Sequence, residues 1–310
     1  MRQTAMNAVH ELAQRDPRVV FIGSDLGAGT LVKMQKEFPD RYFMEGVSEA
    51  HIIGMAAGLA MDGFIPYVNT IATFLTRRCY EQVAIDLCLH ELPVRLIGSG
   101  GGAVYAPLGP THMATDDIAI MRALPNMTIC APADAEEMKR LMDASLDVRG
   151  PMYIRVAKGG DPIVSRSELG FSIGRAISMR EGADVLFVST GVLSGRCLSA
   201  AERLQSQGIE AGVLHAHTVK PLDVQQIRER AGRVSLVVSV EEHSLVGGLG
   251  SALAEMFADA GLATPLLRLG LPDTFTSSYG SQDSVLSKYG LTAEAIAAST
   301  QARLLSKVVG

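Results

Sequence analysis

Residues 44–58 read MEGVSEAHIIGMAAG, and this segment is the strongest indication of the chain's architecture. Its apolar residues recur at helical spacing, which predicts a core-facing helix; they are Ile52, Ile53, Ala56, Ala57 and Ala60. Ser48 is the predicted N-cap, so Glu49 falls in the first turn of a helix that runs toward Met61. Because the helix dipole favours an acidic residue there, a purely structural role for Glu49 is the alternative to a chemical one.

Short β-branched runs alternate with helical patterns along the whole chain. The predicted strands are 19–22, 65–68, 94–97, 127–130 and 152–156 in the first half and 185–189, 211–215, 236–240 and 266–269 in the second. This alternation predicts an α/β fold with two domains, each a mainly parallel sheet flanked by helices. We expect the first domain at 1–165, a linker at 166–178 and the second domain at 179–310.

Composition excludes several classes of protein. With 310 residues and 47% hydrophobic content, the chain can bury large cores, and its net charge of -5 gives no basic surface for nucleic acid. The four cysteines are scattered without a Cys-x-x-Cys pair, and no stretch reaches the roughly 20 apolar residues of a membrane span. No cluster of side chains has metal-ligand spacing. We therefore expect a cytoplasmic protein that binds neither nucleic acid nor membrane.

Four segments, in order along the chain, carry a family resemblance. They are Gly46-Val47-Ser48-Glu49, Thr73-Phe74-Leu75-Thr76-Arg77, Gly109-Pro110-Thr111-His112 and the stretch 241–251, EEHSLVGGLGS. Together they resemble the transketolase family, including the deoxyxylulose-phosphate synthases, over essentially the whole chain. The resemblance implies a thiamine diphosphate pyrimidine-binding fold followed by a transketolase C-terminal-domain-like fold. It also implies that Glu241, His243 and the glycines after them are structural.

The resemblance assigns roles around the cofactor's aminopyrimidine ring. Glu49 would bind the N1′ nitrogen and help to remove the thiazolium C2 proton, a proton transfer worth typically ~10²–10⁴-fold in rate. Phe74 would pack on the ring, and Tyr80 is either a second such aromatic or core packing. Leu26 would support the bent cofactor, and Asp25 belongs either to the cofactor pocket or to a subunit interface.

The resemblance also assigns substrate contacts. His112 would lie beside the substrate carbonyl, while Arg2 and Arg155 match arginines that hold a substrate phosphate. The alternative for Arg2 is an ordinary surface ion pair. Gly100 stands where a phosphate-contacting histidine is expected in the family. Pro107-Leu108 replaces an acidic pair that helps to recognise the hydroxyl groups of the sugar. These departures predict an unusual sugar phosphate, branched or otherwise modified. Arg77, where some transketolases have phenylalanine, is a further departure.

Half of the expected cofactor site is missing from the sequence. The family holds the diphosphate and Mg²⁺ through a Gly-Asp-Gly sequence, and this chain contains none. We therefore expect the second subunit of a split transketolase, assembled as α2β2 with a separate N-terminal subunit that carries the metal and diphosphate site. It would transfer a two-carbon ketol unit from a ketose phosphate to an aldehyde. The alternatives are the β subunit of a 2-oxoacid dehydrogenase and a non-catalytic assembly or regulatory module.

Overall fold

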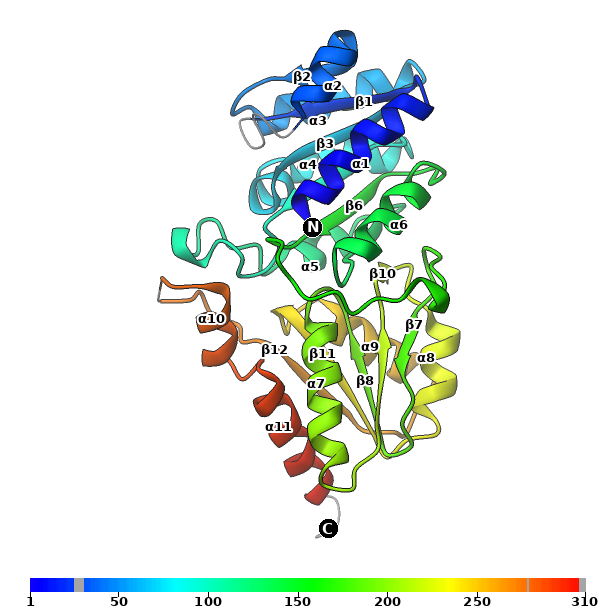
Figure 1. The fold of residues 1–310 in the computed structure, drawn as a ribbon, viewed down its shortest axis with the longest axis vertical. Coiled ribbons are helices and arrows are strands. Elements are labelled where there is room, and N and C mark those ends of the chain that lie inside the picture. The colour runs from blue at the N-terminus through cyan, green and yellow to red at the C-terminus, as the bar shows by residue number, and fades with distance from the viewer. Residues whose placement is uncertain (25–30, 278, 307–310) are drawn as a thin grey trace.

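Two sheets lie one above the other along the long axis of the molecule (Figure 1). The structure is a computed structural model, and it describes residues 1–24, 31–277 and 279–306. Both sheets carry helices on their two faces, so the predicted two-domain α/β architecture is confirmed. Among the described residues, no helix is both long and apolar enough to cross a membrane.

The first sheet has seven strands within the described residues, in the order β10-β5-β6-β4-β3-β1-β2. Their bounds are β1 (Val19–Gly23), β2 (Tyr42–Met44), β3 (Ile65–Ile71), β4 (Arg95–Ser99), β5 (Thr128–Cys130), β6 (Met152–Val156) and β10 (Thr218–Lys220). Neighbouring strands are parallel except β10, which is antiparallel to β5. Since parallel strands share one carboxyl edge, the segments that follow β3 and β4 emerge side by side there.

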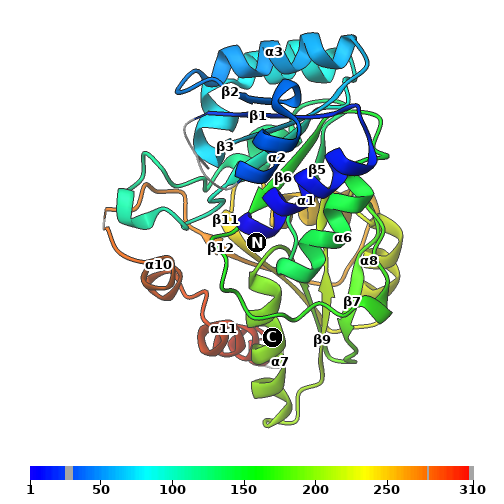
Figure 2. The same ribbon diagram turned by 45° about the horizontal axis from the view of Figure 1, so that its top comes forward.

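Helices and short helical turns cover the first sheet. They are α1 (Arg2–Arg15), α2 (Val32–Glu37), η1 (Pro39–Arg41), α3 (Glu49–Met61), η2 (Phe74–Arg78), α4 (Tyr80–Gln82), η3 (Val83–Leu89), α5 (Asp117–Arg122) and α6 (Ala135–Ser145). Two further turns, η4 (Ala106–Leu108) and η5 (Ser167–Leu169), pack against the second domain instead. One hydrophobic core joins α1, α2 and α6 to the sheet, and another joins α3, η2, η3 and α5 to the opposite face. In Figure 2, α3 lies at the end of the molecule away from the second sheet.

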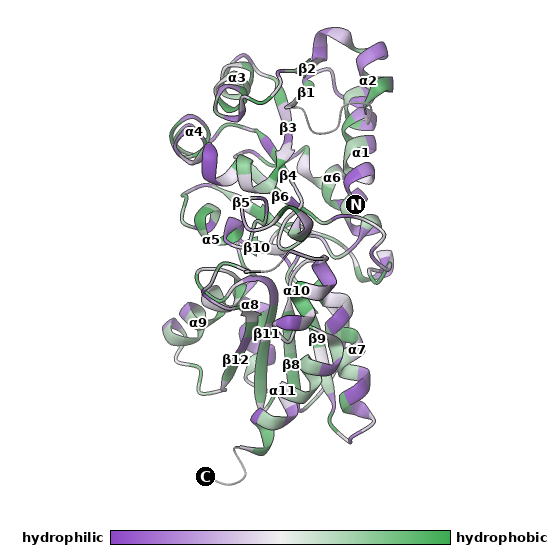
Figure 3. Ribbon diagram, turned by 90° about the vertical axis from the view of Figure 1, so that its left-hand side faces the viewer, coloured by the Kyte–Doolittle hydropathy of each residue, from purple (hydrophilic) through white to green (hydrophobic). Residues whose placement is uncertain are grey.

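The second sheet has five strands within the described residues, in the order β12-β11-β8-β9-β7, with β7 antiparallel to β9. Its strands are β7 (Ile177–Arg180), β8 (Val185–Ser189), β9 (Ala211–His215), β11 (Leu236–Ser244) and β12 (Leu266–Leu271). Its helices are α7 (Leu193–Gln205), α8 (Val224–Ala231), α9 (Leu249–Asp259), α10 (Gln282–Lys288) and α11 (Ala293–Leu305). Coloured by hydropathy, β8 and the first half of β11 are mostly apolar, as central buried strands require, whereas the second half of β11 is polar (Figure 3).

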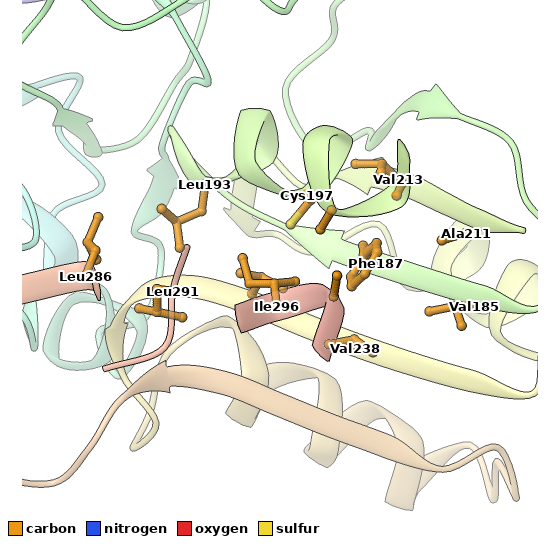
Figure 4. Close-up of a cluster of buried hydrophobic side chains, with 14 of the residues drawn as sticks. Val185, Phe187, Leu193, Cys197, Ala211, Val213, Val238, Leu286, Leu291 and Ile296 are labelled. Carbon is orange, nitrogen blue, oxygen red and sulfur yellow. The ribbon is translucent and has the colours of Figure 1, made fainter. Parts of the chain in front are cut away.

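The larger core of the second domain lies between this sheet and the helices α7, α10 and α11. Phe187 and Val238 of the sheet point toward Ile296 of α11 (Figure 4), and all three side chains are fully buried. Burying each such side chain contributes roughly 1.5–3 kcal/mol. This core also includes Ala103, Ala106 and Met113, so the loop after β4 of the first domain packs into the core of the second.

Every strand that the sequence predicts is present, within a few residues at each end. The predicted core residues of α3 are buried, as are Met138, Leu141 and Met142 of α6. The sequence patterns missed β2, β7 and β10, which are three or four residues long. The predicted linker contains η5 and the first residues of β7, so the division at 166–178 stays a prediction.

Candidate active site

Glu49 begins α3, as predicted, and Ser48 is at the N-cap position, but its side chain does not cap the helix. The Ser48 side chain makes no capping hydrogen bond to the helix; its hydroxyl donates to the Glu45 carbonyl at 3.0 Å. Gly46, with φ of 71°, makes the turn from β2 into the helix, a backbone conformation that glycine adopts without strain. As a result, the Glu49 side chain points inward and is only 3% exposed.

Arg78 is the partner of that buried carboxylate. Its Nη1 donates to Glu49 Oε2 at 2.7 Å, and its guanidinium carbon lies 4.2 Å from the centre of the Phe74 ring. Both contacts arise in η2, a π-helical turn after β3, and such turns frequently mark functional sites. The Arg78 side chain is 47% exposed, so it reaches Glu49 from the solvent side.

His112 comes to the same place from the loop after β4. Its ring meets Phe74 edge-on, with the ring centres 5.2 Å apart, and its Nδ1 lies 2.9 Å from the Thr111 hydroxyl. Arg77 holds the end of this loop, because its guanidinium donates to both carboxylate oxygens of Asp116. The structure therefore brings Glu49, Phe74 and His112 together, with Arg78 between the first two.

The two arginines predicted to hold a substrate phosphate have different surroundings. Arg155 is only 8% exposed, and its guanidinium donates to both oxygens of Asp117 at 2.8 and 3.0 Å. It also donates to the backbone carbonyls of Ala114 and Glu242. These bonds are made by Nε and Nη2 of Arg155, and the predicted phosphate contact stays a prediction. Arg2, the first residue of α1, is half-buried and remains a candidate.

Electrostatics explain how the buried Arg155–Asp117 pair persists. Burial, the largest single influence, raises the pKa of Asp117, but the charge and hydrogen bonds of Arg155, with smaller contributions from His243 and Tyr153, together leave this pKa below its ordinary value. Tyr153 donates a hydrogen bond to the same carboxylate at 2.7 Å. Asp117 thus stays ionised in the interior, and the pair fixes α5 against β6.

Three other predicted cofactor contacts have mixed outcomes. Tyr80 is half-buried in α4 and packs against the core beneath α3, in agreement with its core-packing alternative. Asp25 and Leu26 lie outside the described residues. In the ranges that the structure describes, no group of His, Cys, Asp or Glu is arranged to hold a metal ion.

The chemistry of this site suits one face of a heteroaromatic ring. A buried carboxylate can bind a ring nitrogen and exchange a proton with it, an aromatic side chain can stack, and an imidazole can donate to a nearby oxygen. No sequence pattern predicts a role for Arg78. The segment 74–78 reads FLTRR, so the sequence offers two consecutive arginines but no sign of which one faces Glu49.

Family comparisons agree with this arrangement. The family described as "Transketolase, pyrimidine binding domain" matches residues 1–160, and "Transketolase, C-terminal domain" matches residues 174–296. The chain therefore belongs to the transketolase family, as the sequence motifs indicate. These families are thiamine diphosphate-dependent, and the chain is a subunit of a transketolase-type transferase.

Individual relatives indicate a split enzyme. A 6-deoxy-6-sulfo-D-fructose transketolase subunit, SqwH, of Clostridium sp. (strain MSTE9) is 38% identical and covers 96% of this chain and 92% of its own length. The 1-deoxy-D-xylulose-5-phosphate synthase of Synechococcus sp. (strain JA-2-3B'a(2-13)) is also 38% identical, but this chain spans only 47% of it. A solved split-gene transketolase, an inactive beta4 tetramer, superposes with a TM-score of 0.89 at 36% identity, covering 97% of this chain and 96% of its own.

Proposed function

We propose that Glu49, Phe74 and His112 form the pyrimidine and substrate side of a thiamine diphosphate site completed by a separate subunit. The supporting observation is the buried Glu49 carboxylate, whose partner Arg78 also lies over the Phe74 ring. The Phe74 ring in turn contacts the ring of His112. Thiamine diphosphate, when bound, supplies the nucleophile and electron sink that side chains lack. Glu49 holds and exchanges a proton at the ring nitrogen, Phe74 orients the ring, and His112 donates to the substrate oxygen.

The partner subunit would contribute Mg²⁺ and the diphosphate site in an α2β2 assembly. Two observations support this division: the chain has no Gly-Asp-Gly, and a full-length relative of similar size is itself called a subunit. Leu26 and Asp25 would complete the cofactor pocket from the segment after β1. Such an assembly would act in the cytoplasm on small sugar substrates.

The substrate would be a modified ketose that carries a terminal anion. Gly100 leaves no room for the expected histidine, because a Cβ there would overlap the Tyr105 ring, and exposed Leu108 offers no polar group. The relative that acts on a sulfo sugar is consistent with a sulfonate in place of the phosphate. Arg2 would supply the cationic contact. Each lost charged hydrogen bond would disfavour ordinary pentose phosphates by roughly tenfold to a hundredfold.

One reconstitution tests the proposal. The chain is purified with its partner, and ketol transfer is assayed with xylulose 5-phosphate plus ribose 5-phosphate and, separately, with 6-deoxy-6-sulfofructose as donor. We expect the sulfo sugar to be the better donor, and Glu49→Gln to lower turnover at least ~10²-fold without preventing assembly, because glutamine keeps the shape but exchanges no proton. The matched control is Glu45→Gln, at a glutamate outside the site. Turnover of Glu49→Gln within about twofold of the parent would remove Glu49 from this role.

A further inference from the structure

Glu241 and Glu242 are consecutive buried carboxylates at the end of β11, where the two domains meet. Successive side chains of a strand point in opposite directions, so the two glutamates serve different domains. Glu241 stays within its own domain, accepting hydrogen bonds from the amides of Leu249 and Gly250 at the start of α9. Glu242 crosses to the first domain, where its Oε1 accepts from the Ala103 amide at 2.7 Å.

Glu242 is packed tightly against the loop that follows β4. A Cβ added to Gly102 would lie 2.5 Å from the Glu242 Cδ atom, which is too close. Gly102 also has a φ of 69°, a backbone conformation that favours glycine, so both the space and the backbone require glycine here. Gln282 at the start of α10 holds the carboxylate from the other side, donating to Oε1 and Oε2 at 2.9 and 2.8 Å. In Figures 1 and 2, the loop after β4 and the segment before α10 project on the same side of the molecule.

Backbone hydrogen bonds connect the segment held by Glu242 to the segment that contains His112. Gly102 and Ala114 exchange both backbone hydrogen bonds, at 2.9 and 3.0 Å, and Ala114 follows His112 by two residues. The Ser244 amide, two residues after Glu242, donates to the Thr115 carbonyl at 2.7 Å. The end of β11 therefore contacts the loop 100–115 at Ala103, before His112, and at Thr115, after it.

We infer that Glu242 is a positioning residue, which fixes His112 relative to Phe74 by holding Gly102 and Ala103. This inference rests on the proposed role of His112 in substrate binding. Burial raises the pKa of Glu242, and the nearby charge of Arg155 opposes this rise. The side chain accepts from the Ala103 amide on one side and from Gln282 on the other, so it can hold the loop in one place. The second domain then contributes to the site as well as to the core.

Hydrogen exchange in the full-length chain tests the positioning without any cofactor. The variants are Glu242→Ala, Glu242→Gln and Gln282→Leu, and Glu241→Ala is the matched control. We expect Glu242→Ala to accelerate exchange of the Ala103 and Ala114 amides by roughly tenfold, since it removes the acceptor of the buried Ala103 amide. Glu242→Gln should be milder, because its amide oxygen can still accept from Ala103. Glu241→Ala should instead accelerate exchange at Leu249 and Gly250.

The assembled complex provides a second readout. We expect Glu242→Ala to lower kcat/KM for the ketose by roughly tenfold to a hundredfold while cofactor affinity stays within about twofold, with partial recovery in Glu242→Gln. Unchanged exchange at Ala103 and Ala114 in the Glu242 and Gln282 variants, or an equal change in Glu241→Ala, would overturn the inference. If Glu242→Ala does not fold, Glu242→Gln and Gln282→Leu decide it. A wild-type complex without ketol transfer would overturn the proposed function. The exchange data would still show whether Glu242 holds the segment at Gly102 and Ala103.

Discussion

Arg78 donates a hydrogen bond to Glu49 at 2.7 Å, so a half-exposed guanidinium pairs with a buried carboxylate. The same guanidinium lies over the Phe74 ring, so one cation contacts both residues that we assign to the cofactor's pyrimidine ring. The Glu49 oxygen that accepts from Arg78 would have to be released, or shared, for the ring nitrogen to bind there. Arg78 is therefore the counterion of Glu49 in the chain by itself, and under the proposed function we expect the cofactor to compete with it.

Replacing Arg78 with alanine should strengthen cofactor binding to the assembled complex. A partly exposed ion pair contributes about 0.2–1 kcal/mol, so removing the competition should lower the apparent Kd up to about fivefold. Isothermal titration with thiamine diphosphate and Mg²⁺ measures this shift. Arg77→Ala is the matched control, because Arg77 pairs with Asp116 and leaves Glu49 alone. Binding more than tenfold weaker in Arg78→Ala would identify Arg78 as a cofactor ligand instead of a competitor.

Arg155 should matter more for stability than Arg2 does. Arg155→Met leaves Asp117 charged and unpaired in the interior, and breaking such a buried pair costs about 3–5 kcal/mol of unfolding free energy. Arg2→Met should cost less than about 1 kcal/mol and should raise KM for the anionic donor. Urea unfolding and steady-state kinetics on both variants provide the comparison. A stable Arg155→Met protein with a selectively raised KM would support the predicted phosphate contact at Arg155.

His217 should make the protein less stable in acid. It is buried and stacks on Phe171 with the ring centres 4.3 Å apart; desolvation, and next the neighbouring His215, lower its pKa to about 4. The unfolded chain binds this proton near pH 6.5, so between pH 6.5 and 4 the unfolded state holds more protons and unfolding free energy falls as pH falls. The full loss is about 3 kcal/mol.

Urea midpoints measured from pH 7 to pH 4 test this dependence. His217→Phe keeps an aromatic ring against Phe171 and should flatten the decline, even if it is less stable at pH 7. The control is His51→Gln, whose side chain is 64% exposed in the parent and should leave the slope unchanged. An equally steep decline in His217→Phe would mean that other groups, such as the buried Glu137–His215 pair, account for the acid sensitivity.

Local patterns predicted the elements well where a strand or helix is long and apolar. α3 buries apolar residues at helical spacing, and β11 begins with an apolar run buried on both faces; the sequence displays both patterns directly. β10 has no such signal, because its three residues become a strand only by pairing with β5 of the other domain. That pairing depends on how the two domains meet, which no local window of sequence contains.

The same distinction holds for the site. Glu49, Phe74 and His112 stand in recognisable motifs, so the sequence predicts them as site residues, and the fold places them near one another. Arg155 stands at a motif position too, but its environment depends on Asp117, which lies 38 residues away in sequence. Arg78 and Glu242 act through contacts that span 29 and 139 residues, and neither contact has a local signature.

The most direct test of the account is calorimetric titration of the isolated chain with thiamine diphosphate and Mg²⁺, beside the same titration of the chain assembled with its partner. The chain offers Glu49 and Phe74 to the pyrimidine ring, while its described residues include no arrangement for the metal that the diphosphate needs. We predict weak binding without Mg²⁺ dependence for the chain alone, and tight, Mg²⁺-dependent binding for the assembly. Tight, Mg²⁺-dependent binding to the isolated chain would contradict a site divided between two subunits.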